Sequence, residues 1–150
     1  MLMDYFIALF ASVISFGCFW AGFKMVRTYL KVSRWNKTEA TIVSKNVELR
    51  KKYSTRQAVA YRPIIQYNYF FNGIDFTGTN VHLEELIGGQ RGYRKEAAEK
   101  MINELPEKIM IYFNPTKPEQ SVMYCKGVGI YFMLFALGGL AFLIALSYVL

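Results

Sequence analysis

Residues 65–79, IQYNYFFNGIDFTGT, predict a β-hairpin. Apolar and polar residues alternate in this stretch, and Asn72-Gly73 supplies the two residues that a type I′ turn prefers. A two-residue turn fixes the register, and the pairs expected on the more apolar face are Phe71 with Ile74, Tyr69 with Phe76, and Tyr67 with Gly78. The opposite face is largely polar, so we expect an antiparallel sheet with one covered side and an open place beside Gly78.

The segments around this hairpin complete a small α+β domain. Ala40–Leu49 is rich in β-branched residues and predicts a strand. Tyr93–Leu105 carries an apolar stripe and predicts an amphipathic helix that covers the sheet. Lys108–Phe113 predicts another strand, and the turn Asn114–Pro118 leads to a last short strand over Ser121–Tyr124. The expected domain has about five antiparallel strands and one helix.

Apolar segments at both ends predict a membrane protein with two transmembrane helices. Residues 5–23 and 127–150 contain no charged side chain, and 19 residues of helix span ~28 Å, close to the thickness of the hydrocarbon core. The chain opens Met-Leu-Met-Asp without a basic residue, which disfavours a cleaved signal peptide. We therefore expect a first transmembrane helix with a cytoplasmic helical extension over residues 5–34, a soluble domain over 35–125 and a second transmembrane helix over 127–150. The roughly one hundred residues between the spans are too few for a two-domain enzyme.

The charge distribution predicts the orientation of these spans. All 18 Lys and Arg residues lie between Lys24 and Lys126, so the positive-inside rule places the central domain in the cytoplasm and both termini outside a bacterial inner membrane. Four basic residues fall on one helical stripe at the exit of the first span, which we name the basic stripe: Lys24, Arg27, Lys31 and Arg34. This stripe is either a topology signal or a contact with anionic lipid head groups.

A second basic segment precedes the hairpin. It contains Arg50, Lys51, Lys52 and Arg56, interleaved with tyrosine. In a chain tethered to a bilayer the nearest polyanion is phospholipid, so we expect either a solvated loop or a contact with anionic lipid, and no nucleic-acid partner.

Small residues at helix-packing distance recur in both spans. They are Gly17, Ala21, Gly138, Gly139, Ala141 and Ala145. Such residues let helices approach closely, so the spans are expected to pack on each other or on a partner. Neither span contains an ionisable residue, which argues against a transporter or a channel.

Few side chains are suited to catalysis. His82 is the sole histidine, with Glu84 and Glu85 close behind it, and the two cysteines have no metal-ligand spacing. A hydrolase or metal site around these three residues stays an alternative, but a third committed metal ligand at a suitable spacing is missing. We expect no catalytic residues, no metal and no cofactor.

Three stretches carry a resemblance to a known family. They are Tyr61-Arg-Pro-Ile-Ile-Gln-Tyr-Asn-Tyr69, Asn72-Gly-Ile-Asp-Phe76 and Ile109-Met-Ile-Tyr-Phe-Asn-Pro-Thr-Lys-Pro118. From about Phe6 to its end the chain resembles a family of small, mainly bacterial membrane proteins of uncharacterised function. In that family two spans flank a β-rich domain that closes on a (Tyr/Phe)-Asn-Pro-x-x-Pro turn. Pro106-Glu107 departs from the glycine that often precedes the penultimate strand. The resemblance implies this architecture and no catalytic residue.

These observations favour a non-enzymatic membrane protein whose β-rich domain binds a protein partner or a second copy of itself. The spans are anchors without a path for ions, and the aromatic strands have a free edge that a partner strand could join. Both features fit an accessory, regulatory or immunity-type role. The alternative is the binding of anionic lipid through the basic residues.

Overall fold

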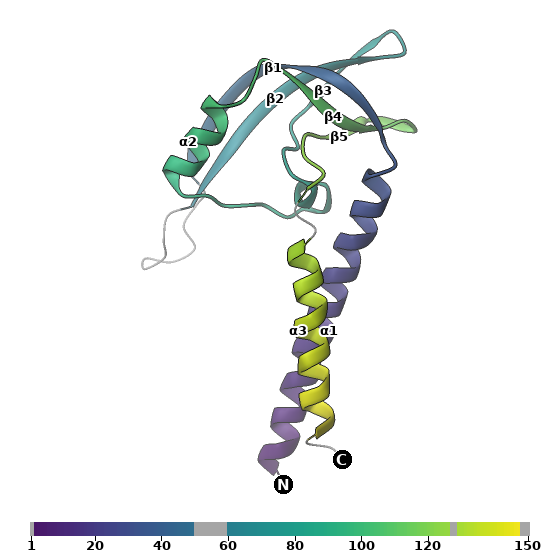
Figure 1. Cartoon of the computed structure of the whole chain (residues 1–150), viewed down its shortest axis with the longest axis vertical. Coiled ribbons are helices and arrows are strands. Elements are labelled where there is room, and N and C mark those ends of the chain that lie inside the picture. Colours follow the sequence, from purple (N-terminus) through teal and green to yellow (C-terminus); the bar gives the residue numbers. More distant parts are fainter. Residues whose placement is uncertain (1, 50–59, 127–128, 148–150) are drawn as a thin grey trace. The chain divides into compact units, whose positions relative to one another are not determined.

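The computed structural model describes residues 2–49, 60–126 and 129–147, and the chain divides into two compact units (Figure 1). One unit combines the two terminal segments, Met1–Lys31 and Gly127–Leu150, and the other is the central segment Val32–Lys126.

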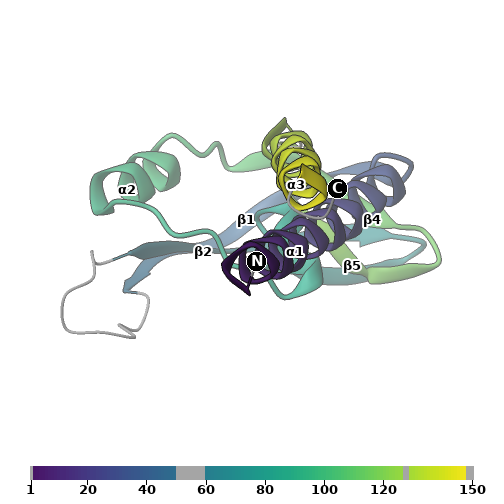
Figure 2. The same ribbon diagram turned by 90° about the horizontal axis from the view of Figure 1, so that it is seen from below.

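The terminal unit is a pair of helices, α1 (Leu2–Val32) and α3 (Gly129–Ser147), which lie side by side in both views (Figures 1 and 2). Within α1, the 28-residue segment Tyr5–Val32 contains an 18-residue window with a mean hydropathy of 2.0, and it is long and apolar enough to cross a membrane. The apolar part of α3, Tyr131–Ser147, is shorter. The predicted helical extension to Arg34 is two residues too long, because the chain turns after Val32, whose carbonyl accepts a hydrogen bond from Trp35 N at 2.9 Å.

Small residues form the contact between α1 and α3. Ser15 Oγ donates a 2.8 Å hydrogen bond to the carbonyl of Gly138, and both residues are buried. A Cβ added to Gly138 would lie 3.3 Å from Cys18 Cβ, and one added to Gly22 would lie 3.1 Å from the Phe135 ring. The two backbones therefore approach closely, as small residues at a helix interface permit.

The central unit is an α+β domain around a five-stranded antiparallel sheet, which confirms the predicted fold of this part. The strands are β1 (Asn36–Leu49), β2 (Tyr61–Phe71), β3 (Ile74–Gly78), β4 (Lys108–Asn114) and β5 (Lys117–Val122), in the order β3-β2-β1-β4-β5. The hairpin of β2 and β3 has the predicted register, with Phe71 opposite Ile74 and Tyr67 opposite Gly78.

Two strand boundaries differ from the prediction. β1 begins at Asn36, four residues early, since Asn36 pairs with Phe113 of β4. β5 begins at Lys117, because the turn before it consists of Pro115 and Thr116 alone. A short 3₁₀ helix, η1 (Leu83–Ile87), was not predicted, and the helix α2 is shorter than expected at Lys95–Asn103.

The hydrophobic core lies on one face of the sheet. It contains Ile65, Tyr67 and Tyr69 from β2 and Ile111 and Phe113 from β4. The helix α2 lies against β1 and β2 and buries Ala98 and Ile102, so it covers this face as predicted (Figure 1). Lys45 Nζ of β1 donates a 3.1 Å hydrogen bond to the carbonyl of Ile102, which fixes the last turn of α2.

The place beside Gly78 is filled, contrary to the expectation of an open one. The Tyr67 ring and the Ser121 hydroxyl occupy it, and a Cβ added to Gly78 would lie only 2.3 Å from either. A glycine is therefore required for packing at this position, where β3 and β5 approach each other.

The sheet curls until the segments that follow its two edge strands meet. Met123 N donates to the carbonyl of Asn80 and Tyr124 N donates to the carbonyl of Val81, each at 3.0 Å. We name this pairing of Asn80–His82 with Met123–Tyr124 the closing seam. It brings the two edges together at one end of the sheet and shortens the free edge that a partner strand could join.

Candidate functional site

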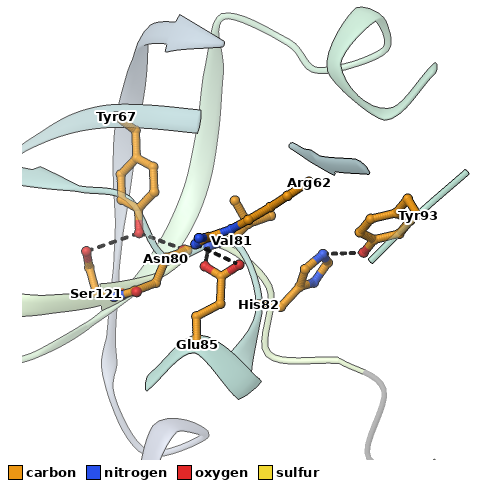
Figure 3. Close-up of polar contacts among 8 residues, drawn as sticks. All are labelled: Arg62, Tyr67, Asn80, Val81, His82, Glu85, Tyr93 and Ser121. Carbon is orange, nitrogen blue, oxygen red and sulfur yellow. Dashed lines mark hydrogen bonds and ion pairs between the residues drawn. The ribbon is translucent and has the colours of Figure 1, made fainter. Parts of the chain in front are cut away.

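The sole histidine lies in the closing seam and is buried. His82 is 9% exposed, and its Nε2 lies 2.5 Å from the Tyr93 hydroxyl (Figure 3). The rings of Tyr93 and Tyr124 flank the imidazole, with centroids 5.8 and 6.0 Å away. Burial, aided by the nearby Arg91 cation, lowers the pKa of His82, so the imidazole is neutral at pH 7.

The two glutamates after His82 are engaged in ion pairs. Glu84 pairs with the Arg91 guanidinium. Glu85 accepts a 2.8 Å hydrogen bond from Val81 N and lies 3.6 Å from Arg62 Nη2 (Figure 3). In the ranges that the structure describes, no three His, Cys, Asp or Glu side chains gather as metal ligands. The geometry therefore gives the metal-site hypothesis no support and points to a structural role for both carboxylates.

A second buried polar group lies next to the seam. The Tyr67 hydroxyl donates to the carbonyl of Asn80 at 3.0 Å and lies 3.1 Å from Ser121 Oγ (Figure 3). Asn80 Nδ2 in turn donates to the carbonyl of Ser121 at 3.0 Å. Burial raises the pKa of Tyr67 well above its ordinary value, so the phenol stays protonated and acts as a donor.

The proline-containing turn that carried the resemblance is part of the fold. Asn114 is buried, and its Oδ1 accepts hydrogen bonds from Thr116 N at 3.1 Å and Thr116 Oγ1 at 2.8 Å. Its Nδ2 donates to Gln120 Oε1 at 3.1 Å. The Tyr69 hydroxyl donates to the carbonyl of Pro118. The Asn-Pro-x-x-Pro motif at Asn114–Pro118 therefore has a structural role, because these hydrogen bonds close the β4–β5 hairpin.

Three residues of the basic stripe lie exposed on α1. Lys24, Arg27 and Lys31 share one helix face, and none of them forms an ion pair within the described ranges. Arg34 is exposed too, but it lies in the turn after α1 and belongs to the central unit. The basic segment Arg50, Lys51, Lys52 and Arg56 lies outside the described residues.

The small residues of the spans divide between the helix contact and the exposed surface. Gly138 and Ala145 are buried and Ala141 is half-buried, whereas Gly17 and Ala21 are exposed. A Cβ added to Gly17 or Gly139 would meet nothing within 4 Å. On α1 the buried small residues are instead Ala8, Ala11, Ser15 and Gly22.

An apolar patch lies on the sheet face opposite the core. Phe70 of β2, Met110 of β4 and Val43 of β1 are 60%, 58% and 56% exposed. Phe70 and Met110 belong to the strands on either side of β1, and the pairing register places Glu39 of β1 between them. Val43 stands at a bulge four residues further along β1. We name these three residues the apolar patch. The exposure of these apolar side chains was not predicted, because the face opposite the core was expected to be largely polar.

The polar side chains around the apolar patch pair with one another. Lys108 Nζ lies 2.9 Å from Glu39 Oε1, and Thr77 Oγ1 donates to Asn68 Oδ1 at 2.9 Å. Lys37 lies over the Tyr112 ring, 5.1 Å from its centroid. A molecule docking on this face would find three exposed apolar side chains among polar groups, several of which already pair with one another.

Comparison with known proteins identifies a family but no function. The chain has no match among curated proteins. Residues 38–126, nearly the whole central unit, match the model of a domain family of unknown function, which agrees with the resemblance at the level of an uncharacterised family. Because this match covers more than half of the chain, the protein belongs to the DUF3592 family.

Proposed function

We propose that this is a non-enzymatic protein, anchored in a membrane, whose central domain binds a protein partner through the apolar patch. The observation that carries the proposal is the exposure of Phe70, Met110 and Val43 on the sheet face opposite the core. An accessory, regulatory or immunity-type role fits such a binding module.

The energetics favour an apolar protein surface as the partner of the apolar patch. Phe70 and Met110 are more than half exposed, and covering each would contribute about 1–2 kcal/mol from apolar area alone. The neighbouring charges of Glu39 and Lys108 compensate each other. A partner therefore needs no strong charge, and aromatic or aliphatic side chains complement this surface best.

The two terminal helices support membrane anchorage. The apolar length of α1 suits a span, and the 19 residues of α3 extend ~28 Å, near the thickness of a hydrocarbon core. The concentration of Lys and Arg between residues 24 and 126 supports a cytoplasmic central domain with both termini outside a bacterial inner membrane.

Site-specific photo-crosslinking in intact cells tests the partner proposal. A photoreactive residue at Met110 is expected to give one discrete protein adduct, and Phe70→Asp in the same chain is expected to abolish it. The matched control carries the photoreactive residue at Lys100 of α2, whose side chain is 73% exposed. An adduct of twice the chain mass would identify a second copy as the partner. Equal labelling from both positions, or adducts with lipid alone, would contradict the proposal.

A second candidate function is the binding of anionic phospholipid by Lys24, Arg27 and Lys31. The exposure of these three side chains on one face of α1 favours lipid binding. Electrostatic attraction to an anionic surface contributes ~1 kcal/mol of binding free energy for each cation. The full chain in nanodiscs that contain both phosphatidylglycerol and a zwitterionic lipid is expected to enrich phosphatidylglycerol around the protein. Changing all three residues to Gln should remove the enrichment. The same change at Lys95, Lys100 and Lys117 is the control, and equal loss in both variants would refute a specific site.

A further inference from the structure

The closing seam joins the sheet to the segment that leads into α3. It consists of two backbone hydrogen bonds, from Met123 to Asn80 and from Tyr124 to Val81. After Tyr124 the chain continues through Cys125 and Lys126 toward α3, which begins at Gly129. Opening the seam would release the end of the sheet that connects to this helix.

His82 connects the closing seam to the start of β2. Its imidazole touches Tyr124 of the seam on one side and the Tyr93 hydroxyl on the other. Tyr93 is itself tied to Tyr61 of β2 by two backbone hydrogen bonds of 2.8 Å. The buried imidazole thus connects the seam to the start of β2 through Tyr93, and Figure 3 shows its contact with the Tyr93 hydroxyl.

The surroundings of His82 disfavour a positive charge. Burial has the largest effect on its pKa, Arg91 lowers the pKa further, and Glu84 opposes them with a smaller effect. Glu84 is paired with Arg91, while Glu85 is held by Val81 N and Arg62. The remaining titratable neighbours are the phenols of Tyr93 and Tyr124, which are neutral below their raised pKa values.

We infer that the closing seam is an acid-sensitive latch, in which protonation of His82 releases Met123–Tyr124 from Asn80–Val81. The sign follows from linkage. The open state exposes the imidazole and binds a proton near pH 6.5, whereas the closed state binds it only at lower pH. Closure is therefore fully stable above pH 6.5 and weakens as the pH falls below that value.

Amide hydrogen exchange of the full chain in nanodiscs at pH 7.5 and 5.5 tests the latch. Protection factors, which correct for the intrinsic pH dependence of exchange, are compared for Met123, Tyr124 and a reference amide. The reference is Ile42, which donates to the carbonyl of Glu107 at 2.8 Å away from the seam. Protection of the two seam amides is expected to fall by up to about tenfold at pH 5.5, and that of Ile42 is not.

Two variants separate the latch from general acid destabilisation. His82→Phe cannot take up a proton, so its seam protection should be the same at both pH values. Arg91→Gln removes the cation that disfavours protonation in the closed state, so its acid response should be smaller than that of the wild type. An unchanged ratio of seam to reference protection in the wild type would overturn the inference. An undiminished acid response in Arg91→Gln would overturn it as well, even if His82→Phe failed to fold.

Discussion

Replacing Gly78 by alanine is expected to remove much of the stability of the central domain. The added Cβ would lie 2.3 Å from both Tyr67 Cε2 and Ser121 Oγ, and 2.5 Å from Tyr67 Cζ. Carbon atoms in ordinary contact are about 3.5–4.0 Å apart, so the overlap exceeds ~1 Å. All three residues are fully or nearly fully buried, so the Tyr67 ring has little space into which it can move.

The expected cost combines overpacking with the loss of a buried hydrogen bond. Overpacking of a dense core costs about 1–3 kcal/mol. Displacing the Tyr67 hydroxyl would also leave the Ser121 hydroxyl and the Asn80 carbonyl without this partner, which costs about 1–3 kcal/mol more. We therefore expect a loss of about 4 kcal/mol, a large fraction of the roughly 5–15 kcal/mol that stabilises a typical domain.

Thermal unfolding of the full chain in detergent micelles, followed by near-ultraviolet circular dichroism of the tyrosines, measures this loss. For a domain of this size each kcal/mol shifts the Tm by ~4–8 °C, so the midpoint should fall by about 15–30 °C. The control is Gly73→Ala, which meets nothing within 4 Å and suffers only from the positive φ of 83°. That backbone effect costs about 1–2 kcal/mol.

The double variant Gly78→Ala/Tyr67→Leu tests the cause of the loss. Leucine removes the ring atoms that the new methyl group would strike, so the double variant should lose less than the sum of the two single losses, by at least ~1 kcal/mol. Strict additivity, or a Gly78→Ala loss no larger than that of Gly73→Ala, would refute the close-packing argument.

Three further changes test other parts of the fold. Lys45→Met keeps the aliphatic stem but removes the hydrogen bond to the carbonyl of Ile102, so the urea midpoint should fall by the equivalent of about 1 kcal/mol with an unchanged m-value. Asn114→Ala removes the acceptor that closes the β4–β5 turn, so it should cost about 1–2 kcal/mol in the same assay, and no loss would show that Pro115 alone sets the turn. Gly138→Val should weaken the pairing of α1 with α3, measured by disulfide trapping between engineered cysteines, whereas Gly139→Val should not, because only the first position faces α1.

Local sequence patterns predicted the hairpin. The start of β1, which these patterns did not predict, depends on pairing with a strand that is distant in the sequence. The register of β2 and β3 follows from a two-residue turn and from alternation within one stretch of sequence. The first residues of β1, Asn36–Glu39, are mostly exposed and polar, and they are a strand because β4 supplies hydrogen-bonding partners. The five-residue η1 has too few residues to show a helical period.

The apolar patch and the helix-contact face of α1 also depend on packing between distant segments, which local patterns do not reveal. Alternation places Phe70 on the face opposite Tyr69, but whether that face is covered depends on where α2 packs. Spacing alone also favoured the exposed pair Gly17 and Ala21 over Ser15 and Gly22, because small residues occur on more than one face of α1. The contact with α3 selects one of these faces, and a pattern within α1 cannot determine which.

The position of β1 has a consequence for how the domain is made. β1 is the first strand to leave the ribosome, yet it lies at the centre of the sheet, and Asn36 pairs with Phe113. Translation at ~5–20 residues per second leaves an interval on the order of 3–15 s before β4 follows. During that interval β1 and β2 can pair, but the other edge of β1 offers unpaired backbone groups to any neighbouring strand. A nascent chain that stops before Lys108 is therefore the form of this protein most prone to aggregate, and folding of the domain is completed only when the second hairpin joins that edge.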